Sequence, residues 1–241
     1  MSDDPINVWR EALKDSNHPR HSAAWVLFSE GMTSEKAEKL LRPKQETVLP
    51  WLLEIVETEP LYQQGSLGNG HAPAVAVGVL GRWKVTEILP RLIAELEDDE
   101  EGGTVFWEEA IEALRAIGEP AIEPLLELAE RTDPGQREIT LSVLADIAKG
   151  NDRALALTLE TLDRMKNEWQ IRYVAESLLV LDPVRGIEAL EARIKARRFD
   201  KKVRGVLEGY IKDTRAGKFH GETIPPEFID MLMPPDDDDL L

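Results

Sequence analysis

The sequence predicts an all-α protein in which about five helical hairpins are stacked as an α-solenoid. Three observations support this fold class. Apolar residues recur at helical spacing, the helices come in pairs joined by short turns, and the pairs recur at a nearly constant interval along the 241 residues. A generic helical bundle is the alternative, but the helix pairs of a bundle need no common interval.

The hairpin at residues 106–131 shows the pattern most clearly. Two amphipathic helices are expected here, because apolar residues fall on one face of each at about 100° per residue. The two faces consist of Ala110, Ile111, Leu114 and Ile117, and of Ile122, Leu125, Leu126 and Ala129. Between them, Gly118 suits a left-handed helix C-terminus and Pro120 suits the first turn of the next helix.

The pattern of the second helix occurs four more times in the sequence. The matching sets are Leu49, Leu52, Leu53 and Val56; Leu89, Leu92, Ile93 and Leu96; Leu155, Thr158, Leu159 and Leu162; and Ile187, Leu190, Glu191 and Ile194. The first positions of the five sets are separated by 40, 33, 33 and 32 residues. First helices recur in phase with them, at residues 76–83, 140–147 and 174–181. Two helical patterns in phase favour a stacked array.

Two stretches, VGVLGRWKVTEILPRLIAELED and IEALRAIGEPAIEPLLELAE, resemble HEAT repeats of the short bacterial and archaeal type, which also occur in phycobilisome lyases. The residues that carry the resemblance are Leu80, Gly81, Pro90, Pro124 and the turn at residues 117–121. The resemblance implies a right-handed superhelix whose second helices line the concave side. HEAT arrays serve as scaffolds, lyase subunits, glycosylases and hydroxylases, so it does not select a function.

The chain is expected to have three parts. Residues 1–42 form a helical N-terminal cap, with helices at 3–14, 19–28 and 34–41 and Thr33 as an N-cap. Residues 43–215 form the HEAT-like array. Residues 216–241 form a short helix at 223–233, between proline pairs, and an acidic tail.

Composition limits the classes of partner. Forty-six acidic and 29 basic residues give a formal net charge of −17, which repels phosphate backbones and anionic membrane surfaces. We therefore expect no nucleic-acid and no membrane partner. The sequence contains no run of 18 apolar residues, its N-terminus does not resemble a secretion signal, and it lacks cysteine. These features favour a cytoplasmic protein without disulfides or thiolate metal sites.

No catalytic or metal site is expected, and no cofactor. The four histidines, His18, His21, His71 and His220, are expected to lie outside the paired helices, and His18 precedes a proline at a predicted helix start, so the spacing of His18 and His21 does not predict a metal site. The glycine-rich segment at residues 61–73 lacks the Gly-Lys-Ser/Thr ending of a phosphate-binding loop. A loop inserted on one face of the array is the better interpretation. The acidic run at residues 98–103 lacks the ligand spacing of a calcium loop and is expected to be a turn.

We expect the concave face implied by the resemblance to bind a partner. Its candidate residues are Trp51, Ile55, Arg91, Glu95, Leu128, Leu157, Thr161 and Arg193. An apolar ribbon flanked by glutamates suits a protein or peptide partner such as an amphipathic helix with basic margins. The alternative is that Leu128 and Leu157 pack between adjacent repeats.

The preferred function is a non-catalytic protein–protein interaction scaffold. A bilin-lyase-like or chaperone-like subunit of an enzyme complex is the alternative, suggested by the repeat type. A DNA-glycosylase-like nucleic-acid binder is less compatible with the net charge.

One basic cluster stands out, consisting of Arg193, Lys195, Arg197, Arg198, Lys201, Lys202 and Arg204. Cations at a helix C-terminus complement the helix dipole, which accounts for part of the cluster. A contact with phosphate or with an acidic partner is the other interpretation. The four aspartates at residues 236–239 are a candidate for neutralising this cluster within the same chain.

Removing these four aspartates is expected to raise the affinity of the protein for polyanions at low salt, because the cluster would lose its internal counter-charge. A binding titration at low ionic strength measures the effect. Unchanged affinity would contradict the neutralisation.

Overall fold

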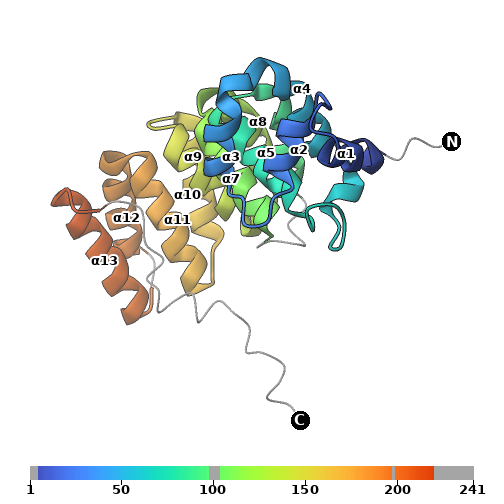
Figure 1. The fold of residues 1–241 in the computed structure, drawn as a ribbon. Coiled ribbons are helices and arrows are strands. Elements are labelled where there is room, and N and C mark those ends of the chain that lie inside the picture. The colour runs from blue at the N-terminus through green and yellow to red at the C-terminus, as the bar shows by residue number, and fades with distance from the viewer. Residues whose placement is uncertain (1–4, 98–103, 197–198, 220–241) are drawn as a thin grey trace, which may run out of the picture.

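The computed structural model describes residues 5–97, 104–196 and 199–219, and in these ranges the protein is all-α, without a strand (Figure 1). The α-helices are α1 (Pro5–Lys14), α2 (His21–Leu27), α3 (Ser34–Leu41), α4 (Gln45–Val56), α5 (His71–Arg82), α6 (Leu89–Glu97), α7 (Val105–Ile117), α8 (Ile122–Arg131), α9 (Glu138–Ile147), α10 (Asp152–Arg164), α11 (Glu168–Leu181), α12 (Pro183–Ala196) and α13 (Lys201–Arg215). Short 3₁₀ segments are η1 (Arg42–Lys44), η2 (Glu59–Tyr62), η3 (Thr86–Ile88), η5 (Glu119–Ala121) and η6 (Pro134–Gln136).

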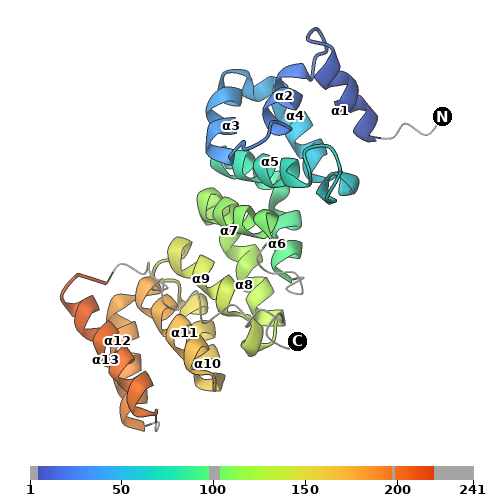
Figure 2. The ribbon, with the colours of Figure 1, turned by 60° about the horizontal axis from the view of Figure 1, so that its bottom comes forward.

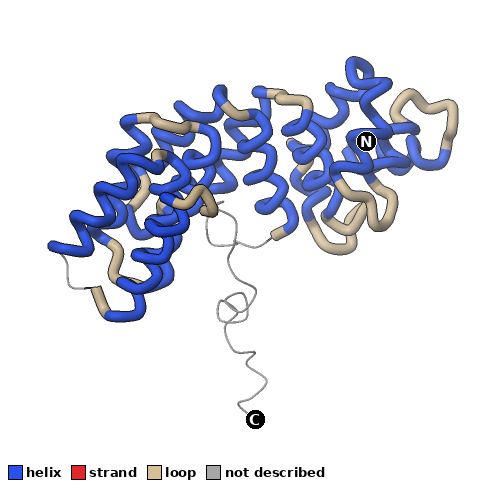
Figure 3. The backbone as a smooth tube through the Cα atoms, turned by 90° about the vertical axis from the view of Figure 1, so that its left-hand side faces the viewer, coloured by secondary structure: helices blue, strands red, loops and turns tan. Residues whose placement is uncertain are grey.

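The helices follow one another in chain order along an elongated molecule (Figures 2 and 3). In what we call the first row, α3 packs against α5, α5 against α7, α7 against α9, α9 against α11 and α11 against α13. The second row consists of α4, α6, α8, α10 and α12, in which α6 packs against α8 and α8 against α10. The rows are joined because consecutive helices also pack together, as α11 does with α10 and α12. Extensive contacts therefore join neighbours in the chain.

Helix positions agree with the apolar periodicity. In the hairpin of α7 and α8 the predicted core residues are buried, except Ile122, which is half-buried. Gly118 ends α7 with φ of 78° and ψ of −128°, so φ is positive but the residue does not adopt the left-handed helical conformation that was predicted. Pro120 lies in the 3₁₀ turn η5 directly before α8. The sequence thus locates the turn correctly, although the turn is tighter than an α-helix.

Polar N-caps fix where several helices begin. Thr33 caps α3 as predicted, since its hydroxyl accepts a hydrogen bond from the Lys36 backbone N–H. The side chains of Thr104, Asn151 and Asp200 do the same for α7, α10 and α13. These contacts satisfy backbone donors that a helix leaves unpaired in its first turn.

Helix α5 is the most enclosed element, because residues 72–81 are all buried. Its glycines allow close approach of neighbouring helices. A Cβ atom added at Gly81 would lie 2.5 Å from both the Cα and the Cβ of Ala113 on α7. One added at Gly78 would lie 2.4 Å from the Cβ of Ser34 on α3. Helix α5 therefore contacts its first-row neighbours at distances that only glycine permits.

The N-terminal region continues the packing of the first row, because α3 contacts α5 and α2 contacts α3. Trp9 on α1 is fully buried, whereas Trp25 on α2 is 56% exposed. The glycine-rich segment forms η2 and a loop that packs near Phe28 and Met32 and borders a cavity of about 500 Å³. None of the helices in the described ranges combines the length and the apolarity needed to cross a membrane.

Several predicted features lie outside the described residues. They are the acidic turn at residues 98–103, Arg197 and Arg198 of the basic cluster, His220, the short helix at residues 223–233, and the acidic tail.

Replacing Gly81 by Ala is expected to destabilise the protein by about 1–3 kcal/mol, the usual cost of overpacking a filled core. Gly205→Ala is the matched control, because the added Cβ meets no atom within 4 Å on the exposed side of α13. This change is expected to stabilise by about 0.5–1 kcal/mol, since alanine is the better helix former. Chemical denaturation of both variants measures the difference, and equal stabilities would contradict the close α5–α7 contact.

Candidate partner-binding surface

Five of the predicted concave-face residues lie partly exposed on the second row. They are Trp51 on α4, Arg91 and Glu95 on α6, Leu157 on α10 and Arg193 on α12. Trp51 and Leu157 also pack against the hydrophobic core, so each has one buried side and one side in reach of solvent. These residues come from different hairpins and are distributed along the row.

The prediction is corrected for three residues. Ile55, Leu128 and Thr161 have exposed fractions of 0%, 1% and 0%, so a partner cannot touch these side chains in this structure. For Leu128 and Thr161 the reason is that α8 and α10 are each covered by helices of more than one hairpin. Helix α8, for example, packs against α6, α9 and α10. Its buried stripe is therefore wider than the four positions that define its own hairpin.

Ion pairs connect successive helices of the second row. Arg131 on α8 donates two hydrogen bonds to the Glu97 carboxylate, with N–O distances of 3.0 and 2.7 Å. Arg193 on α12 does the same with Asp163 on α10, at 2.7 Å for both bonds. The hydrogen bonds from Arg131 are the main reason that the pKa of Glu97 lies below its ordinary value. Two-pronged arginine–carboxylate pairs fix geometry as well as charge.

A third arginine links α10 to α8. Arg153 on α10 donates to the Glu123 carboxylate at 2.7 and 3.0 Å and to the Glu130 carboxylate at 3.0 and 2.8 Å. The partners in these three second-row links are 23 to 34 residues apart, and two of the links span 30 residues. We call the three links the ion-pair ladder. It neutralises three arginines that would otherwise be available to an anionic ligand.

Arg91 has a different environment. Its guanidinium lies 5.1 Å from the ring centre of Tyr62 and 5.4 Å from that of Phe106, and it is paired with Glu95 at 3.5 Å and Glu59 at 3.8 Å. The two rings contact each other edge to face at 5.0 Å. Burial raises the pKa of the Tyr62 hydroxyl to about 12. The hydroxyl therefore stays protonated near neutral pH and donates to the Val56 carbonyl.

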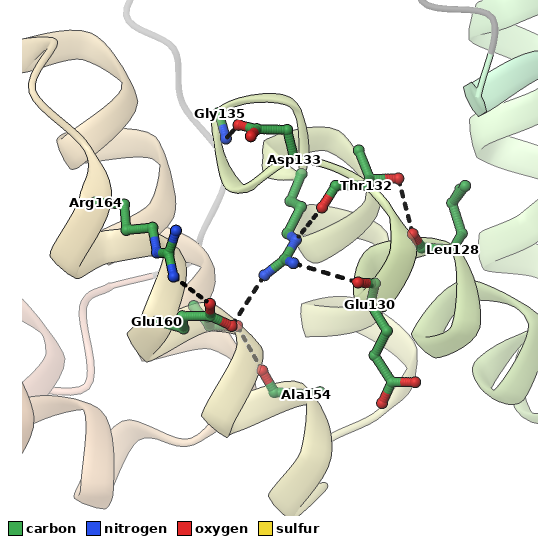
Figure 4. A network of polar contacts seen from close by, with 10 residues as sticks. Leu128, Glu130, Thr132, Asp133, Gly135, Ala154, Glu160 and Arg164 are labelled. Atoms are coloured by element: carbon green, nitrogen blue, oxygen red, sulfur yellow. Dashed lines mark hydrogen bonds and ion pairs between the residues drawn. The ribbon is translucent and has the colours of Figure 1, made fainter.

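The best-buried charged group is Arg137, between α8 and α9, whose side chain is 7% exposed. It donates to the Thr132 carbonyl at 2.8 Å and to the Glu160 carboxylate at 3.2 Å, and it reaches the Glu130 carbonyl at 3.5 Å. Figure 4 shows these acceptors, together with Arg164, which also pairs with Glu160. Arg137 thus ties the α8–α9 turn to α10.

The predicted basic cluster is divided by its contacts. Arg193 is paired with Asp163, Lys202 with Glu168 at 3.3 Å, and Arg204 donates to the Ile194 carbonyl. Lys195 and Lys201 are exposed.

Lys195 instead lies with Lys212 and Arg215 around a groove between α12 and α13. Lys212 and Arg215 were not predicted, because they lie outside the basic run at residues 193–204. Only the packing of α13 against the end of α12 brings them near Lys195, and this packing could not be derived from the sequence pattern.

The three described histidines lie in different environments, and His71 is the first residue of α5 rather than outside the paired helices as predicted. The Nδ1 atom of His18 accepts a hydrogen bond from the Arg20 backbone N–H, and that of His21 lies 2.8 Å from the Ala12 carbonyl oxygen. His71 is exposed beside the cavity at the glycine-rich loop. Within the described ranges, no group of three or more histidine, aspartate or glutamate side chains is arranged to hold a metal ion.

Comparison with protein-family models, with curated proteins and with solved structures gave no match to this chain. The HEAT resemblance therefore stays a prediction that rests on the sequence pattern.

Arg137→Met is expected to destabilise the protein by about 1–3 kcal/mol, because the partly buried Thr132 carbonyl and the Glu160 carboxylate lose a charged donor. Arg153→Met is the control, since it removes an exposed arginine with more hydrogen bonds. Its effect is expected to be smaller, because exposed ion pairs contribute little. Denaturant titration compares the two variants. A larger loss from Arg153→Met would show that exposed pairs, rather than the buried arginine, stabilise this region.

Proposed function

We propose that this protein is a non-catalytic scaffold of the HEAT type, an α-solenoid that binds a partner protein along its second row. Support for the architecture comes from the sequence interval of 32 to 40 residues between hairpins and from the packing of each hairpin on the next. An array of this kind offers a long surface in which successive hairpins contribute equivalent positions.

The observation that carries the proposal is the partial exposure of Trp51 and Leu157 on helices of the second row. A solvated helix face would normally carry polar groups at such positions. Exposed apolar side chains between charged ones are typical of binding surfaces. The proposed contact is therefore apolar at these points and polar around them.

Charge defines the class of partner. The ion-pair ladder neutralises Arg131, Arg153 and Arg193, while Glu127 on α8 and Glu188 on α12 are exposed. The chain as a whole has a formal charge of −17. A complementary partner is an amphipathic helix that places its apolar stripe against the second row and its basic margins beside the exposed glutamates.

Leu157→Glu and Trp51→Glu are expected to abolish capture of the partner from native lysate, because a buried carboxylate would oppose the apolar contact. Ala156→Glu is the control, since it adds the same charge to an exposed position of the same helix as Leu157. Quantitative mass spectrometry of the captured proteins compares the variants, and thermal unfolding checks that each is folded.

If the proposal is correct, the wild type and Ala156→Glu capture the same partner proteins. Leu157→Glu and Trp51→Glu no longer capture them, although their melting temperatures are unchanged. Loss of capture only together with a fall in melting temperature would instead assign Trp51 and Leu157 to packing between hairpins. Captured proteins that are lost equally by Ala156→Glu would also contradict a specific apolar contact.

A further inference from the structure

A groove of about 420 Å³ lies between α12 and α13, at the end of the described array. Ile194 and Ile211 contribute its apolar surface. Lys195, Lys212 and Arg215 supply positive charge along it, and Glu191 and Glu208 supply negative charge. Arg215 is paired with Glu191 at 2.9 Å, so Lys195 and Lys212 are the cations that remain for a ligand.

Arg215, the last residue of α13, lines this groove, and the described chain ends four residues later at Phe219. After α13 the backbone reverses at Gly217, which has φ of 64°, and the Lys218 N–H donates to the Asp213 carbonyl at 2.9 Å. The Phe219 ring then contacts Tyr210 of the same helix, with ring centres 5.3 Å apart. The chain is therefore directed back along α13 where its description ends, on the face that carries Tyr210, and it must pass around α13 to reach the groove.

The sequence that follows has the composition of a ligand for such a groove. Residues 220–241 lie outside the described structure, but their sequence contains apolar residues at helical spacing. These are Ile224, Phe228, Ile229, Leu232 and Met233. Glu227 and Asp230 lie among them, and the four aspartates follow. An apolar stripe with acidic flanks complements two isoleucines flanked by lysines.

Distance and charge favour this segment over a separate molecule. Ile224 follows Phe219 with four residues between them, and an extended chain covers roughly 3.3–3.6 Å per residue, whereas packed helices are only about 8–10 Å apart. An acidic partner in solution would be repelled by the net charge of −17. A tethered segment has a high effective concentration and needs no long-range attraction.

We propose that residues 224–233 bind in the groove between α12 and α13 of the same chain. The apolar side chains of this segment cover Ile194 and Ile211, and its carboxylates lie towards Lys195 and Lys212. This site differs from the basic cluster expected from sequence, because Arg193, Lys202 and Arg204 already have partners within the array.

Paramagnetic NMR of the full chain tests the proposal. The sequence has no cysteine, so Met233→Cys provides a single attachment site for a nitroxide. With the isoleucine methyl groups labelled, the nitroxide is expected to reduce the Ile194 and Ile211 signals more than twofold. The signal of Ile111 on α7 serves as the distant reference.

Two double variants should restore the lost signals. Phe228→Asp with Ile229→Asp removes the apolar contact, and Lys195→Glu with Lys212→Glu reverses the exposed charges of the groove. The matched control is Lys44→Glu with Lys166→Glu, which makes the same charge change at exposed positions elsewhere and should leave the broadening intact.

Full signal intensity at Ile194 and Ile211 in the spin-labelled chain would overturn the proposal, as would broadening that survives both double variants. A mixture of isotope-labelled chains without nitroxide and spin-labelled chains without isotope shows whether the broadening arises within one chain or between two chains. Broadening in this mixture would also overturn the proposal, because the occupant would then be a second copy of the chain.

Discussion

The contact between neighbouring hairpins is the constraint on which the structure depends. A pair of amphipathic helices cannot bury its apolar face alone, so each hairpin must be covered by the next. This contact is closest between α5 and α7, where Gly81 lies against both the Cα and the Cβ of Ala113 and leaves no room for a side chain of its own. The enclosed state of α5 follows from that approach, and α3 and α7 are positioned by it on either side.

The helices in the described residues were largely predictable because the apolar period marks their extent and polar N-caps mark where several of them begin. Residues 122–131 form α8 where the pattern Ile122, Leu125, Leu126 required a helix. The face that each helix leaves exposed was less predictable. Three residues expected on the exposed face, Ile55, Leu128 and Thr161, are buried. The apolar period of one helix shows which face it buries in its own hairpin, but not which other helices pack against it.

Charged contacts were the least visible from sequence, because acidic residues are too numerous for any pair to be selected. The partners of Arg131 and Arg193 lie 34 and 30 residues earlier in the chain, one hairpin away. Proximity along the chain suggested a single basic cluster instead. In space that cluster separates, and Lys195 meets Lys212 across the α12–α13 groove. Pairing of helices, rather than composition, decides which charges act together.

Neighbouring hairpins are held together by two kinds of contact, and the charged kind has a mechanical consequence. Apolar contact between close backbones joins α5 to α7, and ion pairs cross between hairpins in both rows, as Arg115–Asp146 does between α7 and α9 and Arg193–Asp163 between α10 and α12. Dissolved ions screen exposed charges and leave apolar contact largely unaffected. The exposed ion pairs between hairpins are therefore expected to weaken as ionic strength rises, whereas the apolar contacts persist. Adjacent hairpins should then shift relative to one another with salt while their helices remain intact.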